Sequence, residues 1–311
     1  MTPHRSAGTL AVIGAVIVFS SSSSIVKWAD TSGPVVAFWR MLGAVAMWWI
    51  VIVVRRAATG RPPPSRQVWR AVLPAGLCFG FNISIFFTAV TRTSIAHAEF
   101  IPSLSPLLLV PAGALLFGER PDRRALPWGA VSILGLAIVL SSGGGGEASL
   151  GGDLLVLVAV LTWVAYLLLA RRARATADVV DFMATMMPIG VLTAGPVAAL
   201  IAIDELWPLS AKGWIAAGLL TVLTGMVSHG LIAFAQREVD VGTISILQVG
   251  QPALAVGWAF LILGEEITVR QVPGMVLVIA GLVVFVRTSQ RRSRAGSVVA
   301  DTRGELAGTA G

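Results

Sequence analysis

The feature that most constrains this chain is a series of long apolar segments separated by short polar loops. Ten segments reach or nearly reach the roughly 20 residues that a helix needs to cross the hydrocarbon core of a bilayer. They run over residues 8–26, 34–54, 71–90, 96–118, 126–141, 153–170, 180–203, 213–234, 243–264 and 271–287. Only 13% of the 311 residues are charged, which leaves too little polar surface for a soluble globule. We therefore predict an all-α membrane protein with ten transmembrane helices.

The first apolar segment resembles a secretory signal peptide, because His4 and Arg5 precede it and serines follow it at 20–24. The apolar stretch resumes at Ile25, however, so that the whole segment reaches bilayer length. We interpret it as a retained first transmembrane helix.

Basic residues mark alternate loops of this arrangement. Of the 23 lysines and arginines, 18 lie in one set of alternate loops and in the two terminal tails, whereas the opposite loops carry many of the acids. The positive-inside rule then predicts cytoplasmic N- and C-termini in a multi-pass protein of the plasma (inner) membrane. The net charge of +7 reflects this topology, so we expect no nucleic-acid partner.

An internal repeat appears when the chain is shifted by 146 residues. Residues 94–141 then align with 240–287 without a gap, so that Pro106 matches Pro252 and the pair Gly118-Glu119 matches Gly264-Glu265. Eleven of the 48 aligned positions are identical, where this composition gives about four by chance. A repeat of five helices inserts its second copy upside down, and inverted repeats of this kind are typical of secondary transporters.

The repeat divides the chain into four predicted regions. These are a first five-helix unit at 1–142, a flexible glycine-rich linker at 143–152, a second five-helix unit at 153–287, and a basic, disordered cytoplasmic tail at 288–311.

Three stretches carry a family resemblance: FWRMLGA at 38–44, TAVTRTSIAHAEFIPSLSPLLLVPAGALLFGER at 88–120, and ISILQVGQPALAVGWAFLILGEE at 244–266. With them, the chain resembles the drug/metabolite transporter (DMT) superfamily and, within it, the EamA-type carriers built from two five-helix repeats. The specific marks are a proline in the middle of helices four and nine, each followed by a closing Gly-Glu pair. One departure is the serine run at 20–24, where such proteins often carry a Trp-Gly pair.

The resemblance implies an alternating-access carrier, with helices one, three, four, six, eight and nine around a central cavity. Many members export amino acids or other small metabolites. We therefore predict a secondary transporter that exports small metabolites such as amino acids, with a small-molecule substrate and surrounding membrane lipid as its partners. The alternative is a lipid scramblase or flippase, which predicts a polar groove open sideways to lipid.

Polar side chains within the apolar segments are candidate substrate-binding residues, because burying them in lipid is costly unless they have partners or water. His97 and Glu99 in helix four form either a proton or cation site, which predicts proton coupling, or an interfacial pair that anchors the helix end. Ser103 lies beside Pro102 and Pro106, which predict a kink or break in this helix.

Other helices supply further candidates. Gln248 and Gln251 share a face of helix nine and either line the cavity or pack between helices, and His229 in helix eight has the same two interpretations. Asn82 in helix three completes the polar set. Trp163 and Tyr166 in helix six form either an apolar pocket or ordinary packing. We interpret Arg40 in helix two as structural, either snorkelling outward or paired with an acid such as Asp30.

The sequence contains no recognisable catalytic machinery. The glycine run at 143–146 lacks the GxxxxGK[ST] pattern of a nucleotide-binding loop, and neither HExxH nor paired Cys/His spacing is present. The single cysteine, Cys78, allows no internal disulfide. We expect no enzyme activity, no cofactor and no bound metal, so that uphill transport requires an ion gradient.

Overall fold

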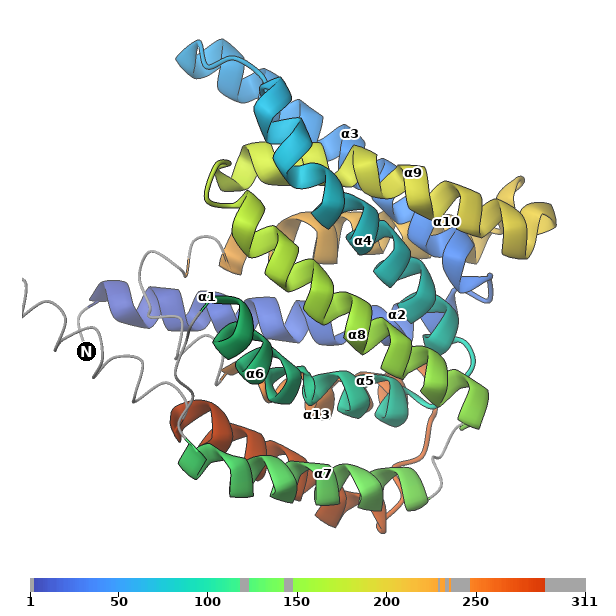
Figure 1. The fold of residues 1–311 in the computed structure, drawn as a ribbon. Helices are drawn as coiled ribbons and strands as arrows, with labels where there is room; N and C mark the ends of the chain where they lie inside the picture. Colours follow the sequence, from blue (N-terminus) through green and yellow to red (C-terminus); the bar gives the residue numbers. More distant parts are fainter. Residues whose placement is uncertain are drawn as a thin grey trace, which may run out of the picture.

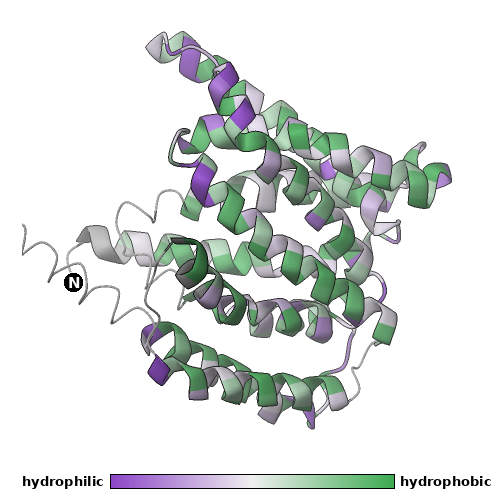
Figure 2. Ribbon diagram, in the orientation of Figure 1, coloured by the Kyte–Doolittle hydropathy of each residue, from purple (hydrophilic) through white to green (hydrophobic). Residues whose placement is uncertain are grey.

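The computed structural model describes residues 3–117, 123–142, 148–228, 230–232, 235 and 247–288. Within these ranges the chain is almost entirely helical. Eight helices are long and apolar enough to cross a membrane, and two shorter apolar helices span Ile95–Leu109 and Gln251–Leu263. Hydrophobic residues dominate along the helices, whereas hydrophilic residues gather near their ends (Figure 2). The described residues thus confirm the predicted all-α membrane fold.

The described residues of the first half form five crossings, whose arrangement Figure 1 shows. They are α1 (Pro3–Ser20) with α2 (Ser22–Trp28), α3 (Gly33–Thr59), α4 (Arg66–Val90), α5 (Ile95–Ser103) with α6 (Ser105–Phe117), and the 3-10 turn η1 (Arg123–Ala125) with α7 (Leu126–Ser141).

The second half contains the other five. They are α8 (Leu150–Ala173), α9 (Val179–Leu206), α10 (Ala211–Val222) with the π-helical η2 (Leu223–Ser228), α13 (Gln251–Leu263), and the C-terminal helix Gln271–Thr288. Because α8 begins at Leu150, residues 150–152, which we predicted to be linker, are helical. Residues 143–147 of the linker and 289–311 of the tail lie outside the described residues.

Polar caps fix the starts of five helices. The side chains of Ser65, Ser94, Ser149, Asp178 and Ser210 each accept a hydrogen bond from the backbone amide three residues further on. Such a bond satisfies one of the four amides that the first turn of a helix leaves without a partner. These short polar side chains therefore set the boundaries between loops and helices.

The two halves contact each other through equivalent residues. At the edge of the bundle, α7 packs against the C-terminal helix through glycines (Figure 1). A Cβ atom added to Gly135 would lie 2.8 Å from the Gly274 oxygen, and one added to Gly281 would lie 2.8 Å from the Trp128 oxygen. A shift of 146 residues converts the first contact into the second. This pairing confirms the inverted repeat.

The same exchange relates the other helix contacts. The third crossing (α4) packs against the sixth (α8) and the seventh (α9). The eighth crossing (α10 and η2) packs against the first (α1) and the second (α3), and the fourth and ninth crossings (α5 and α13) contact each other. Exchanging the halves reproduces this set of contacts, as two inverted five-helix repeats require.

The fourth and ninth crossings break at equivalent positions. The fourth is interrupted at Leu104, between α5 and α6, and the ninth has a turn at Val249 and Gly250 before α13. The amides of Leu104 and Gly250 each donate to the carbonyl three residues earlier at 3.2 Å. Leu104 and Gly250 are 146 residues apart, so the break is part of the repeat.

Prolines explain both breaks. Pro106 and Pro252 follow the two interruptions by two residues. A proline has no amide proton, and its ring clashes with the carbonyl four residues earlier, so it weakens the helix that precedes it and is well tolerated in the first turn of the next one, where Pro106 of α6 and Pro252 of α13 lie. The break that we predicted in helix four is therefore confirmed. Backbone groups freed within a membrane are tolerated where they are buried in protein or line a water-filled cavity.

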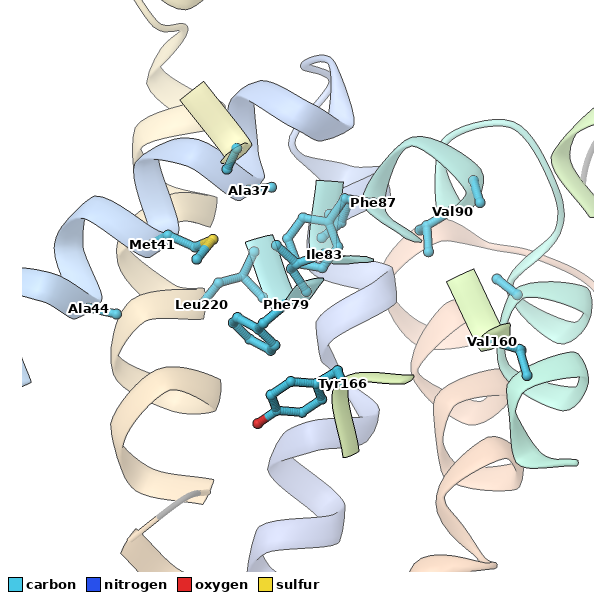
Figure 3. Packing of buried hydrophobic residues seen from close by; sticks show 14 of the residues in the cluster. Ala37, Met41, Ala44, Phe79, Ile83, Phe87, Val90, Val160, Tyr166 and Leu220 are labelled. Atoms are coloured by element: carbon cyan, nitrogen blue, oxygen red, sulfur yellow. The ribbon is translucent and has the colours of Figure 1, made fainter. Parts of the chain in front are cut away.

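The centre of the bundle is an apolar cluster built around α4 (Figure 3). Phe79, Ile83 and Phe87 of α4 pack with Met41 of α3 and Leu220 of α10. All five side chains are buried. Because α4 also contacts α8 and α9, this cluster connects helices of both halves.

Candidate functional site

Glu99 lies buried where three crossings meet. Its side chain is only 6% exposed and belongs to α5. The Ser23 hydroxyl of α2 donates a hydrogen bond to Glu99 Oε1, and the Gln251 side chain of α13 also hydrogen-bonds Glu99. The first, fourth and ninth crossings therefore converge on one carboxyl group, which two neutral polar side chains hold in place.

The serine run explains how Ser23 reaches this position. The hydroxyls of Ser20 and Ser21 each donate to the carbonyl three residues earlier at 2.8 Å, and the helix is interrupted at Ser21. Serine hydroxyls that bond back to the helix compete with its regular hydrogen bonds and often bend it. The short helix α2 then places Ser23 against Glu99. The departure from the EamA-type pattern thus supplies a donor to the buried acid.

His97 is held by an acid from the sixth crossing. Its ring is 3% exposed, and Nδ1 lies 3.0 Å from both carboxylate oxygens of Asp153 in α8. Thr93 Oγ1 donates to Asp153 Oδ1 at 2.7 Å. A carboxylate only accepts hydrogen bonds, so Nδ1 carries the proton in this contact. The buried Nε2 atom has no partner among the described residues.

Beside the His97–Asp153 contact, an ion pair joins the first and ninth crossings. Lys27 Nζ lies 2.6 Å from Glu265 Oε1 and donates to the Thr93 carbonyl at 3.0 Å. Glu265 Oε2 accepts from the Ile95 amide at 3.1 Å, and so caps the start of α5. Gly264 ends α13 with a positive φ of 68°, which glycine adopts without steric cost. The closing Gly-Glu pair therefore ends one helix and caps another.

We call Lys27, Thr93, His97, Asp153 and Glu265 the Lys27 cluster. It connects the first, fourth, sixth and ninth crossings at one end of the bundle. A pocket of about 910 Å³ opens beside it, and its lining includes Lys27, Arg92, Ser149 and Glu265. The pocket reaches the cluster but its lining does not include the more deeply placed Glu99.

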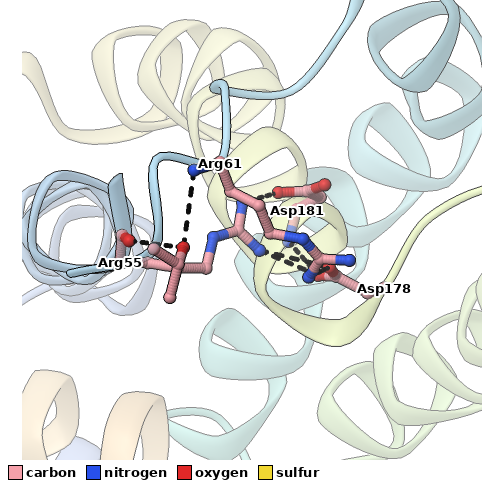
Figure 4. A network of polar contacts seen from close by, with 5 residues as sticks. Arg55, Arg61, Asp178 and Asp181 are labelled. Atoms are coloured by element: carbon pink, nitrogen blue, oxygen red, sulfur yellow. Dashed lines mark hydrogen bonds and ion pairs between the residues drawn. The ribbon is translucent and has the colours of Figure 1, made fainter. Parts of the chain in front are cut away.

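The opposite end of the bundle is held by a different ionic network (Figure 4). Arg55 of α3 pairs with Asp178 at 3.1 Å and with Asp181 of α9, and Arg61 pairs with Asp178 at 3.2 Å. These contacts connect the second and seventh crossings, whereas the Lys27 cluster connects the first, fourth, sixth and ninth. Each end therefore has its own set of ion pairs.

Neutralising either member of the Lys27–Glu265 pair is expected to destabilise the protein. Both side chains are at most one quarter exposed, so we expect Lys27→Gln or Glu265→Gln to cost about 2 kcal/mol, between the values for exposed and buried pairs. Thermal unfolding in detergent measures this cost. The exchanged pair Lys27→Glu with Glu265→Lys should recover part of it, and Asp204→Asn, on an exposed side chain, is the control. Equal melting temperatures for all variants would contradict the assignment.

The remaining predicted residues have different surroundings. Asn82 Nδ2 donates to the Ala159 carbonyl at 2.6 Å and to Thr162 Oγ1 at 2.8 Å, which joins α4 to α8. Ser103 Oγ donates to the Phe100 carbonyl at 2.7 Å, directly before the break in the fourth crossing. The structure therefore uses both of these polar groups for packing contacts.

The two aromatic candidates belong to one cluster. The rings of Trp163 and Tyr166 are 5.0 Å apart between centroids, and those of Tyr166 and Phe79 are 5.1 Å apart. The Tyr166 hydroxyl points away from the apolar cluster around α4 (Figure 3). The rings thus form an aromatic wall between α4 and α8, with one polar group at its edge.

The two glutamines do not share one continuous helix. Gln248 precedes the turn at Val249 and Gly250, and Gln251 begins α13 after it. Of the two glutamines, only Gln251 has a described contact with Glu99. His229 lies outside the described residues, directly after η2.

Sequence reasoning missed three partners of the site. Ser23, Asp153 and Glu265 lie far along the chain from Glu99, His97 and Lys27, respectively, so local patterns do not reveal these contacts. For Ser23 the available signal was the serine run, and for Glu265 it was the repeated Gly-Glu pair.

A helical membrane protein with two inverted halves, and with polar side chains buried where the halves meet, defines the class of membrane carriers. The model of the EamA-like transporter family matches residues 6–141 and 150–287. The chain therefore belongs to the EamA-like transporter family, whose members carry small molecules across membranes.

Two further comparisons agree with this assignment. A protein of Clostridium kluyveri described as an uncharacterized transporter is 24% identical over 221 residues, which cover 67% of this chain and 68% of that protein. A protein of known crystal structure superposes with a TM-score of 0.64 at 18% identity, over 92% of this chain and 98% of the other. At this identity, the second match shows the fold alone.

Proposed function

We propose that this protein is a secondary carrier that exports small metabolites, such as amino acids, across the plasma (inner) membrane by alternating access. The observation that carries the proposal is the buried carboxyl group of Glu99, at the junction of the first, fourth and ninth crossings. Burying an ionisable residue at such a depth is costly, so a residue of this kind is a functional candidate by default. Its convergence with the two interrupted helices matches the position of binding sites in inverted-repeat transporters.

In this proposal, Glu99 exchanges a proton during the transport cycle. Ser23 and Gln251 are neutral, so they hold the side chain in either protonation state without fixing its charge. The interruptions at Leu104 and Gly250 are the places where each of these two helices can bend during the cycle. Proton movement through Glu99, down an existing proton gradient, then supplies the free energy that uphill transport requires.

The Lys27 cluster is the closed end of the carrier. With both termini in the cytoplasm, as the loop charges favour, this end faces the outside and the Arg55 network faces the cytoplasm. The pocket beside Lys27 is then the outer vestibule. Export requires the Lys27–Glu265 and His97–Asp153 contacts to separate, so that solute passes from the interior to this vestibule.

Transport by the purified protein tests the proposal. We expect proteoliposomes to take up at least one solute from a panel of amino acids, amines and nucleosides faster than liposomes without protein, with a rate that responds to an imposed pH gradient. Absence of flux for every solute would overturn the carrier. A dithionite assay distinguishes the alternative. Dithionite added outside quenches a fluorescent phospholipid only in the outer leaflet, so complete quenching would show that the protein moves lipid between leaflets, as a scramblase does and a solute carrier does not.

A further inference from the structure

Arg40 is a buried cation that meets no counter-ion among the described residues. It lies seven residues after the start of α3, about 10 Å along the helix, and its side chain is 6% exposed. It shares the buried face of α3 with Ala37 and Ala44. Among the described residues, no hydrogen bond or ion pair reaches its guanidinium group. The contact that the structure shows is with the Phe87 ring, 5.5 Å from the ring centroid.

This surrounding differs from both structural roles that we considered for Arg40. The side chain does not snorkel to the surface, and it forms no ion pair with Asp30. A guanidinium group carries five donors, and burying an unpaired ion costs several kcal/mol. A cation–π contact restores about 2 kcal/mol when the pair is desolvated, which is less than this cost. Arg55, in contrast, lies at the end of the same helix and pairs with two acids.

The backbone around Arg40 is fixed, and a second unpartnered group lies on a neighbouring helix. Thr221 Oγ1 of α10 donates to the Arg40 carbonyl at 3.0 Å. The helix α2 contacts α3, α4 and α10, and on it the fully buried Ser24 hydroxyl has no partner among the described residues. Two helices in contact thus each present an unsatisfied polar group inside the bundle.

We propose that Arg40 binds the carboxylate of the transported solute. The inference rests on the proposed function and names its substrate class: a small solute with one carboxylate group. The planar guanidinium forms two parallel hydrogen bonds with a carboxylate. One cation neutralises one negative charge, which favours a carboxylate over a phosphate dianion. Arg40 thereby holds the solute, whereas Glu99 exchanges the proton.

Binding to the purified full-length protein tests this inference. We would titrate alanine, leucine and phenylalanine, their carboxamides, and inorganic phosphate, and follow the melting temperature and the heat of binding. At least one carboxylate should bind, and its carboxamide should bind at least about tenfold more weakly, the loss expected when a charged hydrogen bond is removed. Arg40→Gln should bind the carboxylate as weakly as wild type binds the carboxamide. Arg40→Lys should bind the carboxylate with an affinity between those of wild type and Arg40→Gln.

A second variant separates binding from a structural role. Arg40→Met removes the unpaired cation and keeps much of the apolar stem, so the solute-free protein should melt at a higher temperature than wild type, because a buried charge without a partner is destabilising. A lower melting temperature would indicate that Arg40 has a structural partner and would overturn the inference. So would binding of no carboxylate, carboxylate affinity unchanged in Arg40→Gln, or phosphate displacing the carboxylate.

The two proposals fail in different ways. If carboxylates bind in an Arg40-dependent manner but no solute crosses the proteoliposome membrane, the carrier function is wrong and the carboxylate site remains. If amines or carboxamides are transported equally by wild type and Arg40→Gln, the carrier remains and the carboxylate site is wrong.

Discussion

Replacing Glu99 with glutamine is expected to slow transport driven by a pH gradient at least about tenfold, equivalent to 1.4 kcal/mol in the barrier. Glutamine keeps the size of the side chain and still accepts a hydrogen bond from Ser23, but it exchanges no proton. Initial rates in proteoliposomes, with and without the gradient, measure the effect. Exchange of labelled for unlabelled solute at equal pH should continue, because it needs no net proton movement.

Two controls define this result. Glu266→Gln removes a carboxyl group from an exposed position at the end of the ninth crossing, and should leave the rate within twofold of wild type. Ser23→Ala removes one hydrogen bond to Glu99 and should have an intermediate effect. If Glu99→Gln retained the full response to the gradient, the proton would travel through another group and our assignment would be wrong.

Among the substitutions proposed for this protein, Gly80→Ala is expected to cause the largest loss of stability. A Cβ atom at this position would lie 2.1 Å from Thr193 Oγ1 and 2.2 Å from the Gly190 oxygen of α9. The second neighbour is backbone, so α4 and α9 must separate at the centre of the bundle. We expect a cost of about 3 kcal/mol, at the upper end for overpacking a core, and a matching fall in the melting temperature.

Gly218→Ala is the matched control for this substitution. Gly218 lies in α10, and an added Cβ would have no atom within 4 Å. The same change there should be neutral or raise stability by up to about 1 kcal/mol, because alanine is a better helix former than glycine. Equal melting temperatures for the two variants would show that α4 and α9 are not packed as closely as described.

Patterns that extend along the whole chain were readable from the sequence. Apolar length identified the ten crossings, and the alignment of Pro106 with Pro252 identified the repeat. The break in the fourth crossing followed from its prolines, and the ninth crossing has the same break because Pro252 occupies the equivalent position. Each of these features depends on residues that are close in sequence or related by the repeat.

The partners of the polar residues were not readable in this way. Glu99 was a candidate from its depth alone, but its contact with Ser23 joins residues 76 positions apart. Asn82 was equally polar, yet it is used between two helices. Arg40 was interpreted as structural because arginine usually finds water or an acid, and only the packing of α3 against α4 shows that its guanidinium group lies over the Phe87 ring and meets no acid among the described residues. Such outcomes depend on which helix faces are apposed.

The glycine seam between α7 and the C-terminal helix has a consequence for how substitutions act. At these contacts each half presents to the other the backbone positions equivalent to those that it meets, which is the arrangement of an isologous dimer, here contained in a single polypeptide. A change at Gly135 therefore meets the counterpart of what a change at Gly281 meets. Elsewhere the halves are free to diverge, as Glu99 and its counterpart Ser245 have done. At the seam both copies keep glycine at the equivalent positions 135 and 281, where the two backbones approach closely.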